Sequence, residues 1–160
     1  MMRIKKFAFW ATTLLLAVVI LNVAAFAADV QSGTWKMNPA KSKYSPGPAP
    51  KELTVTVQVD ENAVKAEAKG TNADGTPLHV EYSAKFDGKD YPITGLPYAD
   101  TVMVERIDAN TLHSTNKKGG QVTMTVHTVV SQDGKTRTTT FTGKDAQGNA
   151  VNNVVVYDKQ

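Results

Sequence analysis

The sequence contains no cysteine. This absence excludes disulfides, thiolate nucleophiles, cysteine-ligated zinc and lipid attachment through a thiol. The stability of the fold must therefore come from its core and its backbone hydrogen bonds. The chain also lacks a nucleophile elbow, a phosphate-binding loop, a dinucleotide fingerprint and a helical His-rich metal motif. These absences predict a protein that is not an enzyme and that uses no cofactor.

An excess of positive charge is missing from most of the chain. The whole sequence has 18 Lys and Arg residues against 15 Asp and Glu residues. Residues 1–27 hold three of the basic residues and none of the acidic ones, so the remainder carries 15 of each. A neutral domain exerts no long-range attraction on nucleic acid or on an anionic membrane surface. We expect neither as a partner.

The N-terminal 27 residues have the pattern of a signal peptide. Arg3, Lys5 and Lys6 precede a largely apolar run over residues 7–25, and Ala25-Phe26-Ala27 fits the small-x-small cleavage rule. An uncleaved anchor is the alternative, because the run approaches the ~20 residues that span a bilayer. The cleavage site favours removal, which leaves a periplasmic or secreted protein without stable membrane insertion.

Residues 28–160 are predicted to form a single domain of β-strands. Apolar and polar residues alternate most clearly over residues 78–86, from Leu78 to Phe86. Further strands are expected at 33–38, 53–60, 64–69, 91–93, 101–107, 111–117, 121–130, 136–143 and 151–157. Residues 38–51 are rich in proline, which predicts an extended connection that could cover a barrel end with Tyr44 as its anchor.

Short turns rich in Asp, Asn and Gly separate these strands, and no segment shows a 3.6-residue apolar period. Consecutive hairpins favour an antiparallel up-and-down meander barrel of about 8–10 strands, because closure removes exposed edges. We expect the first and last strands to meet, with Trp35 plugging one end. The loop at 145–149 leaves open whether Val154 and Val156 or Val155 and Tyr157 face inward.

Three short motifs resemble those of the calycins, the group that holds lipocalins and fatty-acid-binding proteins. GTWKMN is similar to the opening strand of a fatty-acid-binding protein, SQDGKTRTTT to its penultimate hairpin and NNVVVYDK to its closing strand. The resemblance implies a small barrel with an interior ligand site. The proline-rich segment stands where that family has two helices, and Val155 stands where it has an arginine. The chain also resembles uncharacterised secreted bacterial proteins, which implies no activity.

The three histidines could bind a metal ion only if their side chains lay on the same face of the sheet. An even-numbered turn at Gly119-Gly120 places His113 and His127 on opposite faces of the sheet, and His79 lies on the polar side of its strand. Zinc needs three or four convergent ligands. The sequence therefore predicts no metal site.

The same parity argument predicts one interior face, if two-residue turns lie at Ala109-Asn110 and Asp133-Gly134. Within that face, the proposed ligand-binding residues are Arg106, His113, Met124, Arg137 and Phe141. An inward arginine is suited to a carboxylate or another anion. The alternative is structural: the arginine stacks on Trp35, and the histidine is a hydrogen-bonded core residue. The full predicted face is Val102, Val104, Arg106, His113, Thr115, Lys117, Val122, Met124, Val126, Arg137, Thr139 and Phe141.

Three functions remain open at this point. The favoured hypothesis is an exported barrel that binds a small hydrophobic, amphipathic or anionic molecule in its interior. The alternative is a filled barrel that acts through its surface, as an interaction or inhibitory module of the cell envelope. An enzyme that uses Arg106 and His113 is the third. Residues 91–98 fit a portal loop or a plain connection, and we favour the connection. The sequence predicts no oligomeric state.

Overall fold

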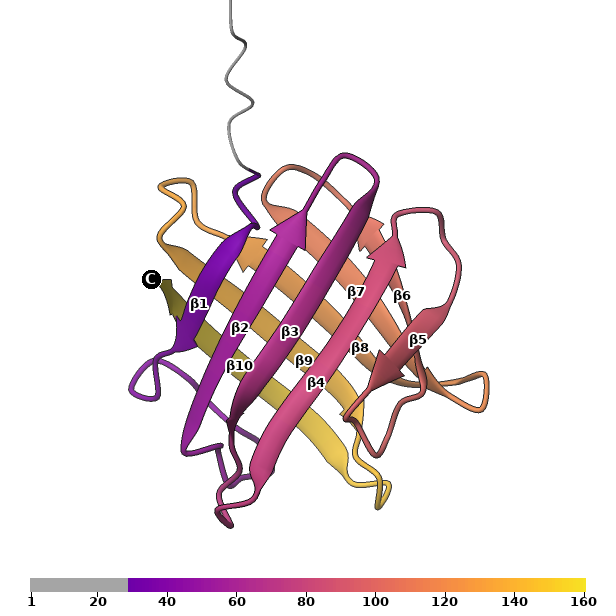
Figure 1. The fold of residues 1–160 in the computed structure, drawn as a ribbon. Coiled ribbons are helices and arrows are strands. Elements are labelled where there is room, and N and C mark those ends of the chain that lie inside the picture. Colours follow the sequence, from indigo (N-terminus) through magenta and orange to yellow (C-terminus); the bar gives the residue numbers. More distant parts are fainter. Residues whose placement is uncertain (1–28) are drawn as a thin grey trace, which may run out of the picture.

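The computed structural model describes residues 29–160, and the predicted signal peptide lies outside the described residues. Ten antiparallel strands follow one another along the chain and close into one barrel, with β1 between β2 and β10 (Figure 1). The strands are β1 (Gly33–Met37), β2 (Glu52–Val59), β3 (Ala63–Thr71), β4 (Pro77–Lys85), β5 (Tyr91–Thr94), β6 (Thr101–Arg106), β7 (Thr111–Lys118), β8 (Gln121–Val130), β9 (Thr136–Lys144) and β10 (Ala150–Lys159). The all-β up-and-down barrel is thus confirmed, and it is the architecture expected of a calycin-like fold. Residues 29–160 contain no helix that is long and apolar enough to cross a membrane.

Aspartate side chains fix six of the hairpin turns. In each turn the carboxylate accepts a hydrogen bond from the backbone N–H two residues later, which is an Asx turn. Such a bond holds the chain in a tight reversal at the point where a strand ends. These aspartates are therefore structural. They are Asp60, Asp74, Asp87, Asp108, Asp133 and Asp145.

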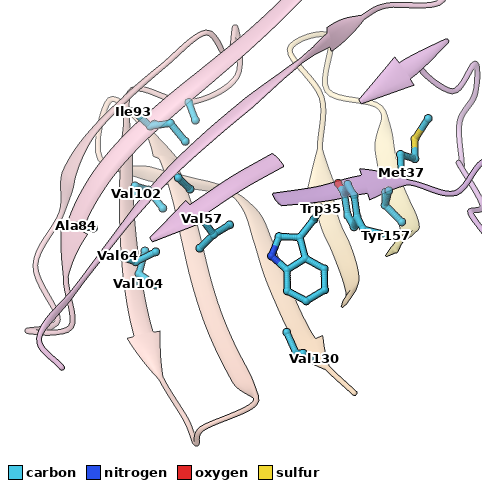
Figure 2. Packing of buried hydrophobic residues seen from close by; sticks show 13 residues of the cluster. Trp35, Met37, Val57, Val64, Ala84, Ile93, Val102, Val104, Val130 and Tyr157 are labelled. Carbon is cyan, nitrogen blue, oxygen red and sulfur yellow. The ribbon is translucent and has the colours of Figure 1, made fainter. Parts of the chain in front are cut away.

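The meeting of the first and last strands is confirmed. Trp35 of β1 pairs with Lys159 of β10 on one side and with Val55 of β2 on the other. Figure 2 shows the Trp35 indole projecting from β1 into the buried hydrophobic cluster. The loop between β9 and β10 has five residues, 145–149, and this length decides which residues of β10 face inward. Val155 and Tyr157 point inward and are 2% and 3% exposed.

The proline-rich segment completes the barrel wall beside β10. β1 has five residues against ten in β10, so most of β10 extends past its partner. Lys43 forms a β-bridge with Val154, and the backbone carbonyl of Ser45 accepts a hydrogen bond from the N–H of Asn152. The segment therefore runs along the side of β10, and its Tyr44 packs against the core and lines the interior cavity, in keeping with the expected anchor.

The predicted interior face is wrong in one strand, β7. The loop between β6 and β7 places Arg106 opposite Leu112, so His113 pairs with Glu105 on the outer face. A β-bulge then leaves Thr123 of β8 without a partner, because Asn116 pairs with Met124 and Lys117 with Val122. The loop reverses which residues of β7 face inward, and the bulge reverses the facing again, so β8 faces as predicted. As a result only β7 is inverted, and His113, Thr115 and Lys117 point outward.

The bulge also corrects two further expectations. Val122 lies beyond the bulge and is 59% exposed, although it was predicted to face inward. His113 and His127 are direct cross-strand partners, with ring centroids 6.5 Å apart, so they share the outer face. The parity argument that separated these two histidines is therefore wrong, because it assumed a ladder without a bulge.

Gly143 is required where β9 passes the bulge. It pairs with Met124, and a Cβ atom added to Gly143 would lie 2.1 Å from the carbonyl oxygen of Thr123. Backbone of the neighbouring strand cannot rotate away as a side chain can. The close approach of the two strands therefore leaves room for glycine alone.

Replacing Gly143 with alanine should lower the free energy of unfolding by about 1–3 kcal/mol, the usual cost of overpacking. Urea denaturation of Gly143→Ala against the unaltered protein measures this loss. Gly47→Ala is the matched control, because no atom lies within 4 Å of its added Cβ. Equal stability of the two variants would show that the strands separate at Gly143 without cost.

Candidate ligand-binding cavity

One end of the barrel is closed by the segment that precedes β1. The backbone carbonyl of Gln31 accepts a hydrogen bond of 3.1 Å from the Trp35 indole, and the Gln31 side chain donates one to the carbonyl of Asn110. Asp29 forms an ion pair with Arg106 from the end of β6. Gln31 and Trp35 are both fully buried. This plug ties the N-terminal segment to the opposite side of the barrel.

A cavity of about 430 Å³ occupies the barrel interior on the other side of this plug. Its lining includes Pro46 and Pro50 of the proline-rich segment, together with Leu96 and Tyr98 of the β5–β6 loop. These loops gather at the barrel end away from the plug (Figure 1). Residues 91–98 therefore contribute to the cavity wall, where the sequence favoured a plain connection.

Arg137 lies on the cavity wall near the plug. It is 7% exposed, its guanidinium carbon lies 5.9 Å from the centre of the Trp35 ring, and its Nη1 donates a 3.3 Å hydrogen bond to Gln31 Oε1. Within residues 29–160, no carboxylate forms an ion pair with Arg137. Every fully enclosed side-chain nitrogen or oxygen in this part of the chain has a hydrogen-bond partner. The remaining guanidinium nitrogens consequently reach open space in the cavity.

The charge of Arg137 is thus buried without a counter-ion. Burial lowers the pKa of Arg137, but an arginine starts above about 12 and stays protonated at neutral pH. A buried unpaired charge is unfavourable, and the ring of Trp35 and one neutral amide compensate it only in part. An anion placed in the cavity would supply the missing partner.

Two tyrosines share this part of the cavity with Arg137. Tyr157 is the direct cross-strand partner of Arg137, and Tyr82 comes from the opposite side of the barrel on β4. Burial raises the pKa of both phenols, so both are neutral hydrogen-bond donors at neutral pH. Arg137, Tyr82 and Tyr157 together present a set of donors suited to an oxyanion.

The five residues proposed from the sequence do not form one site. Met124, Arg137 and Phe141 line the cavity together. Arg106 is outside the cavity lining and is bound to Asp29 at the plug, with Phe86 6.0 Å from its guanidinium carbon. His113 is on the outer face, where its Nδ1 lies 3.6 Å from Glu105 Oε2. The arginine that stacks on Trp35 is Arg137 in place of Arg106.

Sequence reasoning missed Gln31, Tyr82 and Tyr157 as contributors to this site. Gln31 lies in a short turn before the first strand and carries no periodic signal. Whether Tyr157 faces inward depends on the length of the last loop, which the sequence left open. Tyr82 belongs to the apolar positions of the alternating segment 78–86, but only the closed barrel brings β4 across from β9.

The outer face carries one group of side chains with the geometry of metal ligands among residues 29–160. The ligand atoms of Glu67, His79 and Glu81 all lie within 4.8 Å of one another. Lys69 Nζ, however, lies 2.7 Å from Glu67 Oε1. Hydrogen bonds from Lys69 and His79 hold the pKa of Glu67 below its usual value. A metal ion at this position would have to displace the lysine.

The comparisons with known proteins add no family to this description. No family model matches the sequence, and no curated protein matches it either.

The buried tyrosines predict a loss of stability in alkali. Burial raises the pKa of Tyr44 to about 12, whereas a phenol in the unfolded chain titrates near about 10. The folded state therefore retains protons that the unfolded state releases, so this contribution is complete below pH about 10 and is lost as the pH rises toward about 12. Urea denaturation across this range, with phenolate absorbance, measures the effect.

The control for this prediction is Tyr44→Phe, which removes the phenol but keeps the ring. This variant should lose less stability between pH about 10 and about 12 than the unaltered protein. Phenolate absorbance that rises fully near pH about 10, while the barrel stays folded, would contradict the assignment of a raised pKa to the buried tyrosines.

Proposed function

We propose that this protein is a binding protein whose barrel holds one small amphipathic molecule with an acidic group. The observation that supports this proposal is Arg137, a buried cation that faces the cavity without a carboxylate partner. In the proposed complex the acidic group contacts Arg137, with Tyr82 and Tyr157 as further hydrogen-bond donors. Guanidinium binds a carboxylate through two parallel charge-assisted bonds.

The rest of the cavity suits an apolar chain. Leu53, Val55 and Leu78 line it on one side, and Met124 and Phe141 line it on the other. A volume of about 430 Å³ falls in the range of small-molecule sites. The same volume argues against the alternative of a filled barrel that acts only through its surface.

We infer that the role is binding without catalysis. The pair of Arg106 and His113, which the sequence offered as possible catalytic groups, is divided between the plug and the outer face. The cavity presents hydrogen-bond donors and apolar surface, which are the elements of a binding site.

Replacing Arg137 with leucine should weaken binding of hexadecanoic acid about tenfold to a hundredfold, because charge-assisted hydrogen bonds are lost. Hexadecanol, which has the same chain without the acid, should bind both forms equally. Calorimetry on delipidated protein measures both affinities. The ligand-free Arg137→Leu protein should also be at least as stable as the unaltered protein, since a buried unpaired charge is removed.

Arg106→Ala is the matched control, because it removes a guanidinium that lies outside the cavity lining. This variant should retain its affinity for hexadecanoic acid and lose stability. Equal loss of affinity in the two variants would refute a specific role for Arg137. A strong loss of stability in ligand-free Arg137→Leu would instead assign Arg137 to the structure of the plug.

We further propose that the protein acts outside the cytoplasm, on the basis of the signal-peptide pattern in residues 1–27. Expression in a bacterium with an intact export pathway should yield a periplasmic or secreted chain that starts at Ala28. N-terminal sequencing of the purified protein measures this start. Recovery of an intact Met1 terminus from the cytoplasm would refute the proposed location.

A further inference from the structure

The cavity contains a second polar group that the acidic end of the proposed ligand leaves unused. Asn116 of β7 lines the cavity and is 4% exposed. Within residues 29–160 its side-chain amide makes no hydrogen bond, although its backbone carbonyl accepts one from Thr123. Because every fully enclosed polar side-chain atom there has a partner, the Asn116 amide reaches open cavity space. A buried polar group in this position is costly unless something pairs with it.

Polar and aliphatic lining residues are unevenly distributed over the strands of the barrel. The strands β2 and β3 contribute only aliphatic residues, Leu53, Val55, Ala66 and Ala68. Ser114 and Asn116 lie together on β7, and Thr128 and Thr139 follow on β8 and β9. The two threonine hydroxyls hydrogen-bond to each other at 3.2 Å. Asp145 and Asn153 also line the cavity, but Asp145 accepts hydrogen bonds from Asn149 and Asn153 Oδ1 accepts one from the N–H of Ser45. On β7, Ser114 and Asn116 face the cavity and their side chains form no hydrogen bond within residues 29–160.

Asn116 is remote from Arg137. Asn116 pairs with Met124 of β8, and Arg137 pairs with Val130 of the same strand. Val130 lies six positions after Met124 on β8, which is roughly 20 Å along the strand at about 3.3 Å per residue. One small polar group cannot contact both side chains. The cavity therefore offers two separate polar positions joined by an apolar wall.

We propose that the ligand carries an oxygen, as a hydroxyl or carbonyl group, far along its apolar chain from the acid, and that Asn116 binds this oxygen. The proposal rests on the proposed function above, and it narrows the ligand class to oxygenated long-chain acids. The Asn116 amide can donate to either group and can accept from a hydroxyl. An unsubstituted chain would bury the amide against methylenes and leave it unpaired.

The test compares hexadecanoic acid with hydroxyhexadecanoic acids that carry the hydroxyl at successive positions along the chain. The unaltered protein should bind the best remote hydroxy acid about tenfold more tightly than hexadecanoic acid. In Asn116→Leu this preference should disappear, while hexadecanoic acid binds as tightly as before or more tightly. Asn152→Leu, the same change on the outer face of β10, should leave the preference unaltered.

The outcomes separate this inference from the proposed function. Equal affinity of the unaltered protein for all the acids, with binding still lost in Arg137→Leu, would overturn the role of Asn116 and leave the binding function intact. Failure of every acid to bind would overturn both. The comparison of acids on the unaltered protein needs no variant. The inference is therefore testable even if Asn116→Leu is unstable.

Discussion

The hydrogen bonds of buried Gln31 are the contacts on which the closed end of the barrel depends. Gln31 bonds at once to Trp35, to Arg137 and to Asn110, so it joins the segment before β1 to β9 and to the β6–β7 loop. This arrangement closes one end and leaves a guanidinium facing inward. The Trp35 ring and the neutral Gln31 amide compensate only weakly for the burial of the Arg137 charge. The plug that closes the barrel therefore also contacts the guanidinium that creates a demand for an anion.

Closure also explains why a cavity remains. Ten strands surround a wider interior than the eight that side chains can fill, and small residues such as Ala66 and Ala68 line part of it. The largest fully buried side chains, Trp35 and Gln31, lie in the plug, whereas buried residues such as Ile93 and Met124 line the cavity. The plug is thus filled by side chains, and the rest of the interior leaves space for a ligand.

Much of this fold follows from local sequence, and the main error has a local cause. All ten strands were predicted from alternation and turn residues, because each depends on neighbours in the chain. The meeting of the first strand with the last was predicted from barrel closure, which removes exposed edges. Which residues of β7 face the interior was not predictable in this way. It depends on the five residues between the paired Arg106 and Leu112 and on a single unpaired residue, Thr123, and neither leaves a periodic trace in the sequence. Each of these two features reverses which residues of the following strand face inward. Because the second reversal cancels the first, β8 faces as predicted and only β7 does not.

The β6–β7 loop and the bulge together decide what β7 and β8 offer to the cavity. Without these register shifts His113 would face inward and Asn116 outward, which would place an ionisable group on the wall in place of a neutral amide. Bulges often re-aim side chains beside binding sites. Here the register leaves one charged group in the cavity lining near the plug, Arg137, and a neutral amide far from it. A ligand that satisfies both must be acidic at one end and polar, but uncharged, further along. The length of β8 between Met124 and Val130 sets that separation.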